Sequence, residues 1–196
     1  MTIPIFLYHP PPIDQSQHLF IRVLRDHLRL RGFLPRIIDA YDVHPQSSGG
    51  SFNTARLEAI RRLLTETDGV ICVAFRQTYI ANGIKFAPHA DYYSEIPVSR
   101  EWLASPWVHV VNAMAWQAGL PLLVLRDSDV IEQGPLEGGP GILGLWMTID
   151  FGSDGELLAQ DLVESPQWST VGGQWEQQCR NVAKRKGEPR RLYEKV

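Results

Sequence analysis

Short runs of consecutive apolar residues alternate along the chain with longer segments in which apolar residues recur every three or four positions. An unbroken apolar run is typical of a strand that is buried on both faces, and the longer period is typical of an amphipathic helix. The runs predict strands over residues 3–8, 34–38, 70–75, 120–125 and 145–151. The periodic segments predict a helix capped by Asp14 or Ser16 and ended by Gly32, a second from about residue 53, and two more over 107–118 and 175–184.

Strands that alternate with helices predict a parallel sheet, because each parallel strand needs a crossover connection and a helix usually supplies it. We therefore predict an α/β fold of three layers, of the flavodoxin or Rossmann type, with about five parallel strands in its central sheet. This domain is expected to span residues 1–160, followed by a C-terminal helix and basic tail over 161–196. Such folds bind ligands at the carboxyl edge of the sheet, so we expect the site there.

Residues 76–106 interrupt this alternation with a segment that is rich in aromatic residues, prolines and charges and has no sustained period. A connection of this length in a compact domain is usually functional or partly helical. We predict an irregular insertion here, whose residues 91–95 act as a lid or contact another subunit.

The composition is that of an ordinary globular protein, with 196 residues, 44% hydrophobic, 21% charged and a net charge of −3. The negative charge gives no general attraction to nucleic acid, and no apolar run approaches the roughly 20 residues that span a bilayer. The N-terminus lacks the layout of a signal peptide, and Cys72, in an apolar run, is expected to be a buried, unreactive thiol. We expect a cytoplasmic protein with no membrane partner and no specific nucleic-acid partner.

Several motifs of known chemistry are missing from the sequence. The first strand is followed by His9 and three prolines rather than by a glycine-rich loop, so it lacks the successive backbone donors that bind a phosphate. Flavodoxin-like proteins bind a phosphate with this loop, so the sequence disfavours a protein of that family, although the predicted fold is of the same type. The histidines are scattered, no paired cysteines occur, and no G-x-S-x-G motif is present. We expect neither a cofactor nor a metal.

Five polar or aromatic residues follow the first three predicted strands. Tyr8 and His9 end the first, Asp39 and Asp42 follow the second, and Arg76 follows the third. An aspartate in this position can accept bonds from ribose hydroxyls, and an arginine can bind phosphate or carboxylate. Turn chemistry, packing against the prolines or plain solvation explains the same residues equally well. We predict that Tyr8, Asp39 and Arg76 converge on one substrate pocket together with His109, which lies in the first turn of the helix predicted over 107–118.

Three short sequences carry a family resemblance that extends over about residues 3–125. Residues 68–73 read DGVICV, residues 113–122 read AMAWQAGLPL, and residues 105–107 read SPW. The first two are similar to the third strand and to the following helix and strand of nucleoside 2-deoxyribosyltransferases. The third resembles the start of the corresponding helix in TIR domains, whose enzymatic members cleave NAD. The resemblance implies the same fold and a nucleoside, nucleotide or NAD-like ligand.

Both families use a glutamate in the first turns of that helix, and in the transferases it attacks or stabilises the anomeric carbon of the sugar. Counting back eight residues from Gly119 gives Val111, and counting four residues on from Trp107 gives Val111 again. The resemblance therefore implies that the family carboxylate is missing. The adjacent His109 and Asn112 are not carboxylates either, but can hydrogen-bond a hydroxyl or a base edge.

Two functions follow from these residues. The first is an enzyme, a hydrolase or transferase, that handles a nucleoside or nucleotide and cleaves or transfers an N-glycosidic bond. Its acid would be Glu101, Glu95 or Asp39. The second is a sensor or signalling module of the same fold that binds a nucleotide without chemistry, which Val111 favours. Either is compatible with a homo-oligomer.

Overall fold

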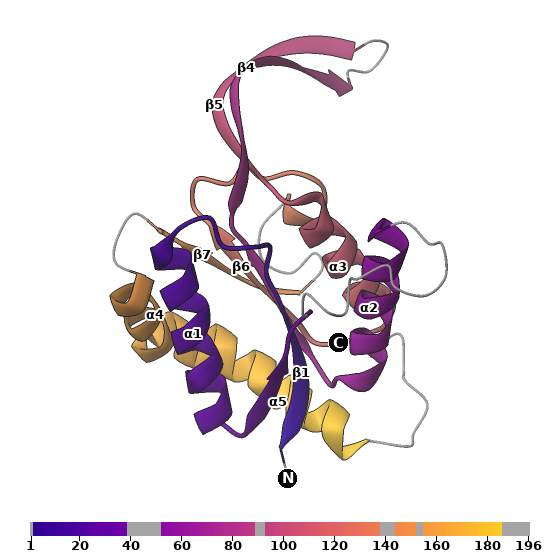
Figure 1. Ribbon diagram of the computed structural model, residues 1–196, viewed down its shortest axis with the longest axis vertical. Helices are drawn as coiled ribbons and strands as arrows, with labels where there is room; N and C mark the ends of the chain where they lie inside the picture. Colours follow the sequence, from indigo (N-terminus) through magenta and orange to yellow (C-terminus); the bar gives the residue numbers. More distant parts are fainter. Residues whose placement is uncertain (1, 39–51, 89–92, 138–143, 152–154, 186–196) are drawn as a thin grey trace.

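The computed structural model describes residues 2–38, 52–88, 93–137, 144–151 and 155–185. At its centre is a sheet of five parallel strands in the order β2-β1-β3-β6-β7 (Figure 1). These strands are β1 (Ile3–Tyr8), β2 (Phe33–Arg36), β3 (Val70–Ala74), β6 (Leu122–Asp127) and β7 (Leu145–Ile149). The predicted α/β fold with about five parallel strands is confirmed.

Helices cover both faces of this sheet (Figure 1). One face carries α1 (Gln15–Leu30), α4 (Gly155–Glu164) and α5 (Gly173–Lys184), and the other carries α2 (Phe52–Glu66) and α3 (Pro106–Gln117). Two short turns complete the layers, the 3-10 turn η2 (Gly134–Leu136) and the π-helical turn η3 (Trp168–Gly172). No helix in the described part of the chain is both long and apolar enough to cross a bilayer.

The middle strand, β3, is fully buried over its whole length. Its side chains alternate between two clusters: Ile71 and Val73 pack on the α1 side, and Cys72 packs on the α2–α3 side. Cys72 is paired with Tyr8 of β1 and with Val124 of β6, so its predicted place in a central strand is confirmed. Burial raises the pKa of its thiol, which therefore stays protonated.

The ends of α1 follow from local chemistry. The Asp14 side chain accepts a hydrogen bond from the backbone N–H of Gln17 at 2.8 Å, which satisfies one of the free donors of the first turn. At the other end Gly32 adopts a φ of +85°, a conformation that glycine reaches without strain. Both limits agree with the sequence-based prediction.

Residues 76–106 correct the prediction of an irregular insertion. They form a long antiparallel hairpin of β4 (Arg76–Pro88) and β5 (Tyr93–Ala104), which extends away from the sheet (Figure 1). The sequence shows no period of two here because residues 81–86 are all exposed, so no single buried face imposes one. Turn-forming prolines and charges then dominate the pattern.

The second correction is α4, which the sequence pattern did not predict. Its buried face includes Gly155 and Ala159, which give little hydrophobic signal. A Cβ on Gly155 would lie 1.8 Å from the backbone oxygen of Ser16, so α4 approaches α1 too closely for a larger residue. The small residues that weaken the hydrophobic pattern of α4 are therefore the ones that let it pack closely on α1.

Trp175 joins α5 to the sheet. Its indole is fully buried and lies 5.5 Å from the Phe33 ring. Its Nε1 donates hydrogen bonds to the backbone oxygens of Val70, at 3.1 Å, and of Pro121, at 3.2 Å. One side chain thereby fastens the helix to the chain where β3 and β6 begin.

We predict that Trp175→Ala lowers the free energy of unfolding by about 3–5 kcal/mol, because a large buried ring is lost. Trp175→Phe should cost only about 1–2 kcal/mol, since it keeps a ring but removes the indole donor from two carbonyls, of which that of Pro121 keeps its hydrogen bond from the Val70 N–H. Urea unfolding measures both. The control is Trp116→Ala, at a helix position 51% exposed, for which a change within about 0.5 kcal/mol is expected. Equal losses of unfolding free energy in Trp175→Ala and Trp116→Ala would contradict the conclusion that Trp175 joins α5 to the sheet.

Candidate functional site

The carboxyl ends of β1, β3 and β6 meet at the edge of the sheet from which the hairpin leaves (Figure 1). Parallel strands end together, so residues that are far apart in the sequence are brought close there. Tyr8 ends β1, and Ser105 follows β5 as the N-cap of α3. The Ser105 Oγ accepts a hydrogen bond from the backbone N–H of Trp107 at 3.3 Å. The first turn of α3 therefore lies at this edge.

Tyr8 is the centre of a polar group at this edge. Burial raises the pKa of its phenol above the ordinary value and outweighs the Arg56 charge and a hydrogen bond with the Ser105 side chain, both of which lower it. The hydroxyl is therefore protonated and can donate a hydrogen bond.

Arg56 of α2 extends this group. Its guanidinium carbon lies 5.1 Å from the centroid of the Trp107 ring, within the range of a cation–π contact, and both side chains are partly exposed. We call Tyr8, Arg56, Ser105 and Trp107 the edge cluster. It combines hydroxyl groups, a delocalised positive charge and an aromatic plane, and none of its four members is a carboxylate.

Sequence reasoning found Tyr8 but missed Arg56 and Ser105 as site residues. The pattern of α2 places Arg56 on a polar face with Arg61 and Arg62, and side-chain spacing does not distinguish the three. Its position in the chain could have identified Arg56 as a site residue. It lies in the first turns of a helix that leads into a parallel strand, and such turns lie at the carboxyl edge of the sheet.

His9, directly after β1, lies on the side of α1 and away from the edge cluster, because its charged neighbours are Arg25 and His18 of that helix. Its Nδ1 lies 2.9 Å from the Pro10 oxygen. Burial is the main cause that lowers the pKa of the imidazole, and the charges of Arg25 and His18 on α1 lower it further. His9 is therefore a neutral side chain on the α1 side of the sheet.

Arg76 forms ion pairs with two aspartates of the protein itself. Its Nε lies 2.9 Å from Asp127 Oδ2, and its Nη1 lies 2.8 Å from Asp129 Oδ2. Burial raises the pKa of the Asp127 carboxyl, against the lowering effects of a backbone hydrogen bond from Asp129 and of the Arg76 charge. The guanidinium also lies 6.0 Å from the centroid of the Trp102 ring. These contacts fasten the base of the hairpin to the end of β6.

His109 and Asn112 lie on the other flank of α3. The His109 Nδ1 is 3.7 Å from the position of a Cβ on Gly134, so this side chain faces η2, whereas Trp107 faces α2. Burial lowers the pKa of His109. Asn112 is fully buried, and neither atom of its amide has a hydrogen-bond partner among the described residues. The structure thus places Tyr8 and His109 on opposite sides of α3.

The two candidate glutamates lie on the hairpin, apart from the edge cluster. Glu101 lies opposite Ile80 in the hairpin, three residues before Ala104. Ala104 is buried on the α2–α3 side, and alternation along β5 directs Glu101 to the opposite face. Glu95 lies farther out, opposite Phe86.

The two predicted aspartates, Asp39 and Asp42, lie outside the described residues. Val111 is fully buried in the core between α3 and the sheet, in the same cluster as Tyr8 and Cys72. A carboxylate in its place would be surrounded by hydrocarbon. Within the described ranges, no group of three His, Cys, Asp or Glu side chains is arranged to hold a metal ion.

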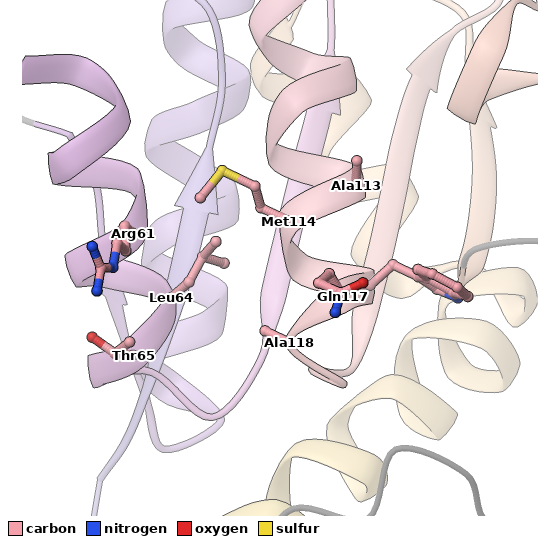
Figure 2. A pocket seen from close by; sticks show the side chains of 8 residues that line it. Arg61, Leu64, Thr65, Ala113, Met114, Gln117 and Ala118 are labelled. Carbon is pink, nitrogen blue, oxygen red and sulfur yellow. The ribbon is translucent and has the colours of Figure 1, made fainter. Parts of the chain in front are cut away.

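A groove of about 520 Å³ lies between α2 and α3, at the end of these helices that is farther from the edge cluster (Figure 2). Its lining comes from the C-terminal halves of α2 and α3 and is mainly apolar, with Leu64 and Met114 beside the polar Arg61 and Gln117. This groove contains no predicted site residue. It is separate from the carboxyl edge, where the edge cluster lies.

No protein-family model matches the sequence, and no curated protein matches it significantly. Solved structures do match. One is a CMP N-glycosidase of Clostridium botulinum, BcmB, with 14% identity over 80% of this chain and 95% of that one, and a TM-score of 0.44. A conserved protein from Enterococcus faecalis V583 has 12% identity, 94% and 99% coverage and a TM-score of 0.40. A LacI family transcriptional regulator from Arthrobacter sp. FB24, in complex with lactose, has 13% identity, 90% and 53% coverage and a TM-score of 0.38.

We predict that Asn112→Leu raises the free energy of unfolding by about 1 kcal/mol, because it removes a buried amide that lacks partners. The matched control is Asn181→Leu, in α5, where the amide is exposed and bonded to Gln177. Both variants gain the same helix propensity, so the difference between them in urea unfolding isolates the effect of burial. A loss of stability in Asn112→Leu alone would indicate that its amide is satisfied in the folded protein.

Proposed function

We propose that the protein binds a nucleotide at the edge cluster. The observation that carries the proposal is the Arg56 guanidinium, held over the Trp107 ring beside the Tyr8 and Ser105 hydroxyls. Arginine binds phosphate through paired N–H donors, an indole plane can stack on a base, and hydroxyls bond sugar or base edges. A phosphorylated nucleoside combines all three features.

The reaction we propose is cleavage or transfer of the N-glycosidic bond. Such a reaction needs a carboxylate at the anomeric carbon, where positive charge develops. Asp39 is the first candidate, because β2, which ends three residues before it in the sequence, pairs in parallel with β1 and ends at the same edge of the sheet. Glu101 is the second candidate, although strand alternation directs it away from that side. Asp42 is proposed as a further ligand contact, whereas His109, which faces η2, and the fully buried Asn112 are not.

A second candidate function is a nucleotide sensor without chemistry. The observation that favours it is Val111, a hydrocarbon side chain fully buried where the resemblance implies the glutamate. Replacing an acid by a hydrocarbon removes the reaction and leaves the binding groups in place. Binding is common to both functions, and turnover distinguishes them.

We predict that nucleoside monophosphates stabilise the protein more than the corresponding nucleosides. At a concentration about 100 times Kd, the gain is about 2.7 kcal/mol, or roughly 5–10 °C in Tm. Arg56→Ala should abolish the advantage of the monophosphate, because its phosphate loses a charged partner, and Arg56→Lys should keep part of it. Thermal-shift titration measures this, with Arg61→Ala on the same helix as the control. Equal responses of Arg56→Ala and Arg61→Ala would refute binding at the edge cluster.

Base release from nucleosides, nucleotides and NAD, measured by chromatography, tests the reaction. We expect turnover that Asp39→Asn reduces at least about 100-fold, while Glu101→Gln changes it little. The reverse ranking would assign the acid to Glu101. Specific stabilisation by a nucleotide without any base release would favour the sensor. In that case Val111→Glu should introduce slow release, at a cost of several kcal/mol for a buried charge.

A further inference from the structure

The outer part of the hairpin has unusually little support from the rest of the molecule. Its base is held by the Arg76 ion pairs, by a hydrogen bond from Gln77 Nε2 to the Pro11 oxygen at 3.1 Å, and by the pairing of Trp102 with Val130. Beyond these contacts β4 and β5 pack mainly on each other, and the ribbon projects away from the sheet (Figure 1). A two-stranded ribbon by itself is only marginally stable in water.

The same part of the hairpin exposes large apolar side chains. Ile84 is 60% exposed, Phe86 61% and Ile96 44%. Ile84 and Phe86 lie two positions apart on β4, so they share one face of the ribbon with Ile80. An exposed apolar face at the end of an unsupported ribbon is typical of a surface that another chain covers.

The two edges of the ribbon differ in their ability to accept another strand. β5 contains Pro97, which lacks a backbone donor, and Arg100, whose φ of +59° departs from extended backbone. Both features are devices that protect an edge from pairing. Before Pro88, β4 contains no proline, and past Arg76 its one charged side chain is Lys85. The edge of β4 is therefore the open one.

β4 is also complementary to itself. If two copies pair antiparallel across a two-fold axis at Asn82, Ile84 lies opposite Ile80 of the second copy and Lys85 opposite its Tyr79. No like charges meet. The corresponding pairing of β5 with itself around Val98 would place Glu95 opposite Glu101, which is unfavourable.

We propose that the hairpin is a dimerisation arm, in which the edge of β4 pairs with β4 of a second copy of this chain. The four-stranded sheet so formed supports both ribbons and joins Ile80, Ile84 and Phe86 of the two copies in one apolar patch. This inference is independent of the proposed nucleotide binding, because none of its residues belongs to the edge cluster.

Light scattering after size-exclusion chromatography tests the dimer. The wild type should have twice the 22.2 kDa mass of the chain. The double variant Ile84→Asp, Phe86→Asp should be monomeric, with a dimer dissociation constant raised at least about 100-fold, because four charges would enter one patch. The control is Leu157→Asp on α4, a position 59% exposed, which should leave the dimer intact. A wild type that stays monomeric at 100 µM (roughly ten times a Kd typical of weak dimers) overturns the proposal.

Disulfide cross-linking distinguishes the two edges. Asn82 and Ser99 are register partners at the same height of the ribbon, one on each edge strand. Asn82→Cys should form a covalent dimer on mild oxidation, since paired strands bring Cα atoms within disulfide range, and Ser99→Cys should not. The native Cys72 and Cys179 are fully buried and should not react. Cross-linking through Ser99→Cys alone would overturn the assignment to β4.

Discussion

Burial of β3 on both faces is the constraint from which the other features of the molecule follow. As the central strand, β3 hydrogen-bonds to a neighbour on each side, β1 and β6, and its fully apolar residues need a helix layer above and below. Between those layers, the ends of the parallel strands are places where polar side chains can gather with access to solvent. The edge cluster lies at the carboxyl ends of β1 and β3.

Polar residues that are adjacent in the sequence are then separated onto opposite faces of the sheet. Tyr8 and His9 are adjacent in the sequence, yet the first meets Arg56 and Ser105 and the second faces α1. A similar separation acts around α3, where Trp107 and His109 lie about 200° apart on the helix and face α2 and η2 respectively. Sequence neighbours at this edge are therefore poor guides to which side chains act together.

The hairpin is an insertion that leaves the sheet order unchanged. β3 reaches the edge, the chain leaves and returns through β4 and β5, and Ser105 starts α3 directly after the return. The Arg76 ion pairs with Asp127 and Asp129 hold the base of the insertion against β6. Its position next to the edge cluster means that an arm joined to a second copy would also hold the two proposed sites in a defined relation.

The sequence by itself determined the parallel sheet, its strand positions and the buried state of Cys72, because unbroken apolar runs and helical periods report directly on burial. It did not determine the hairpin, whose exposed faces impose no period, or α4, whose packing depends on the small Gly155 and Ala159. Of Arg56 and Arg76, the sequence indicated only the second as a site residue, because it directly follows a strand. Tertiary structure decided that one lies over an indole at the edge and the other is neutralised by two carboxylates, because partners supplied by distant segments leave no trace in local spacing.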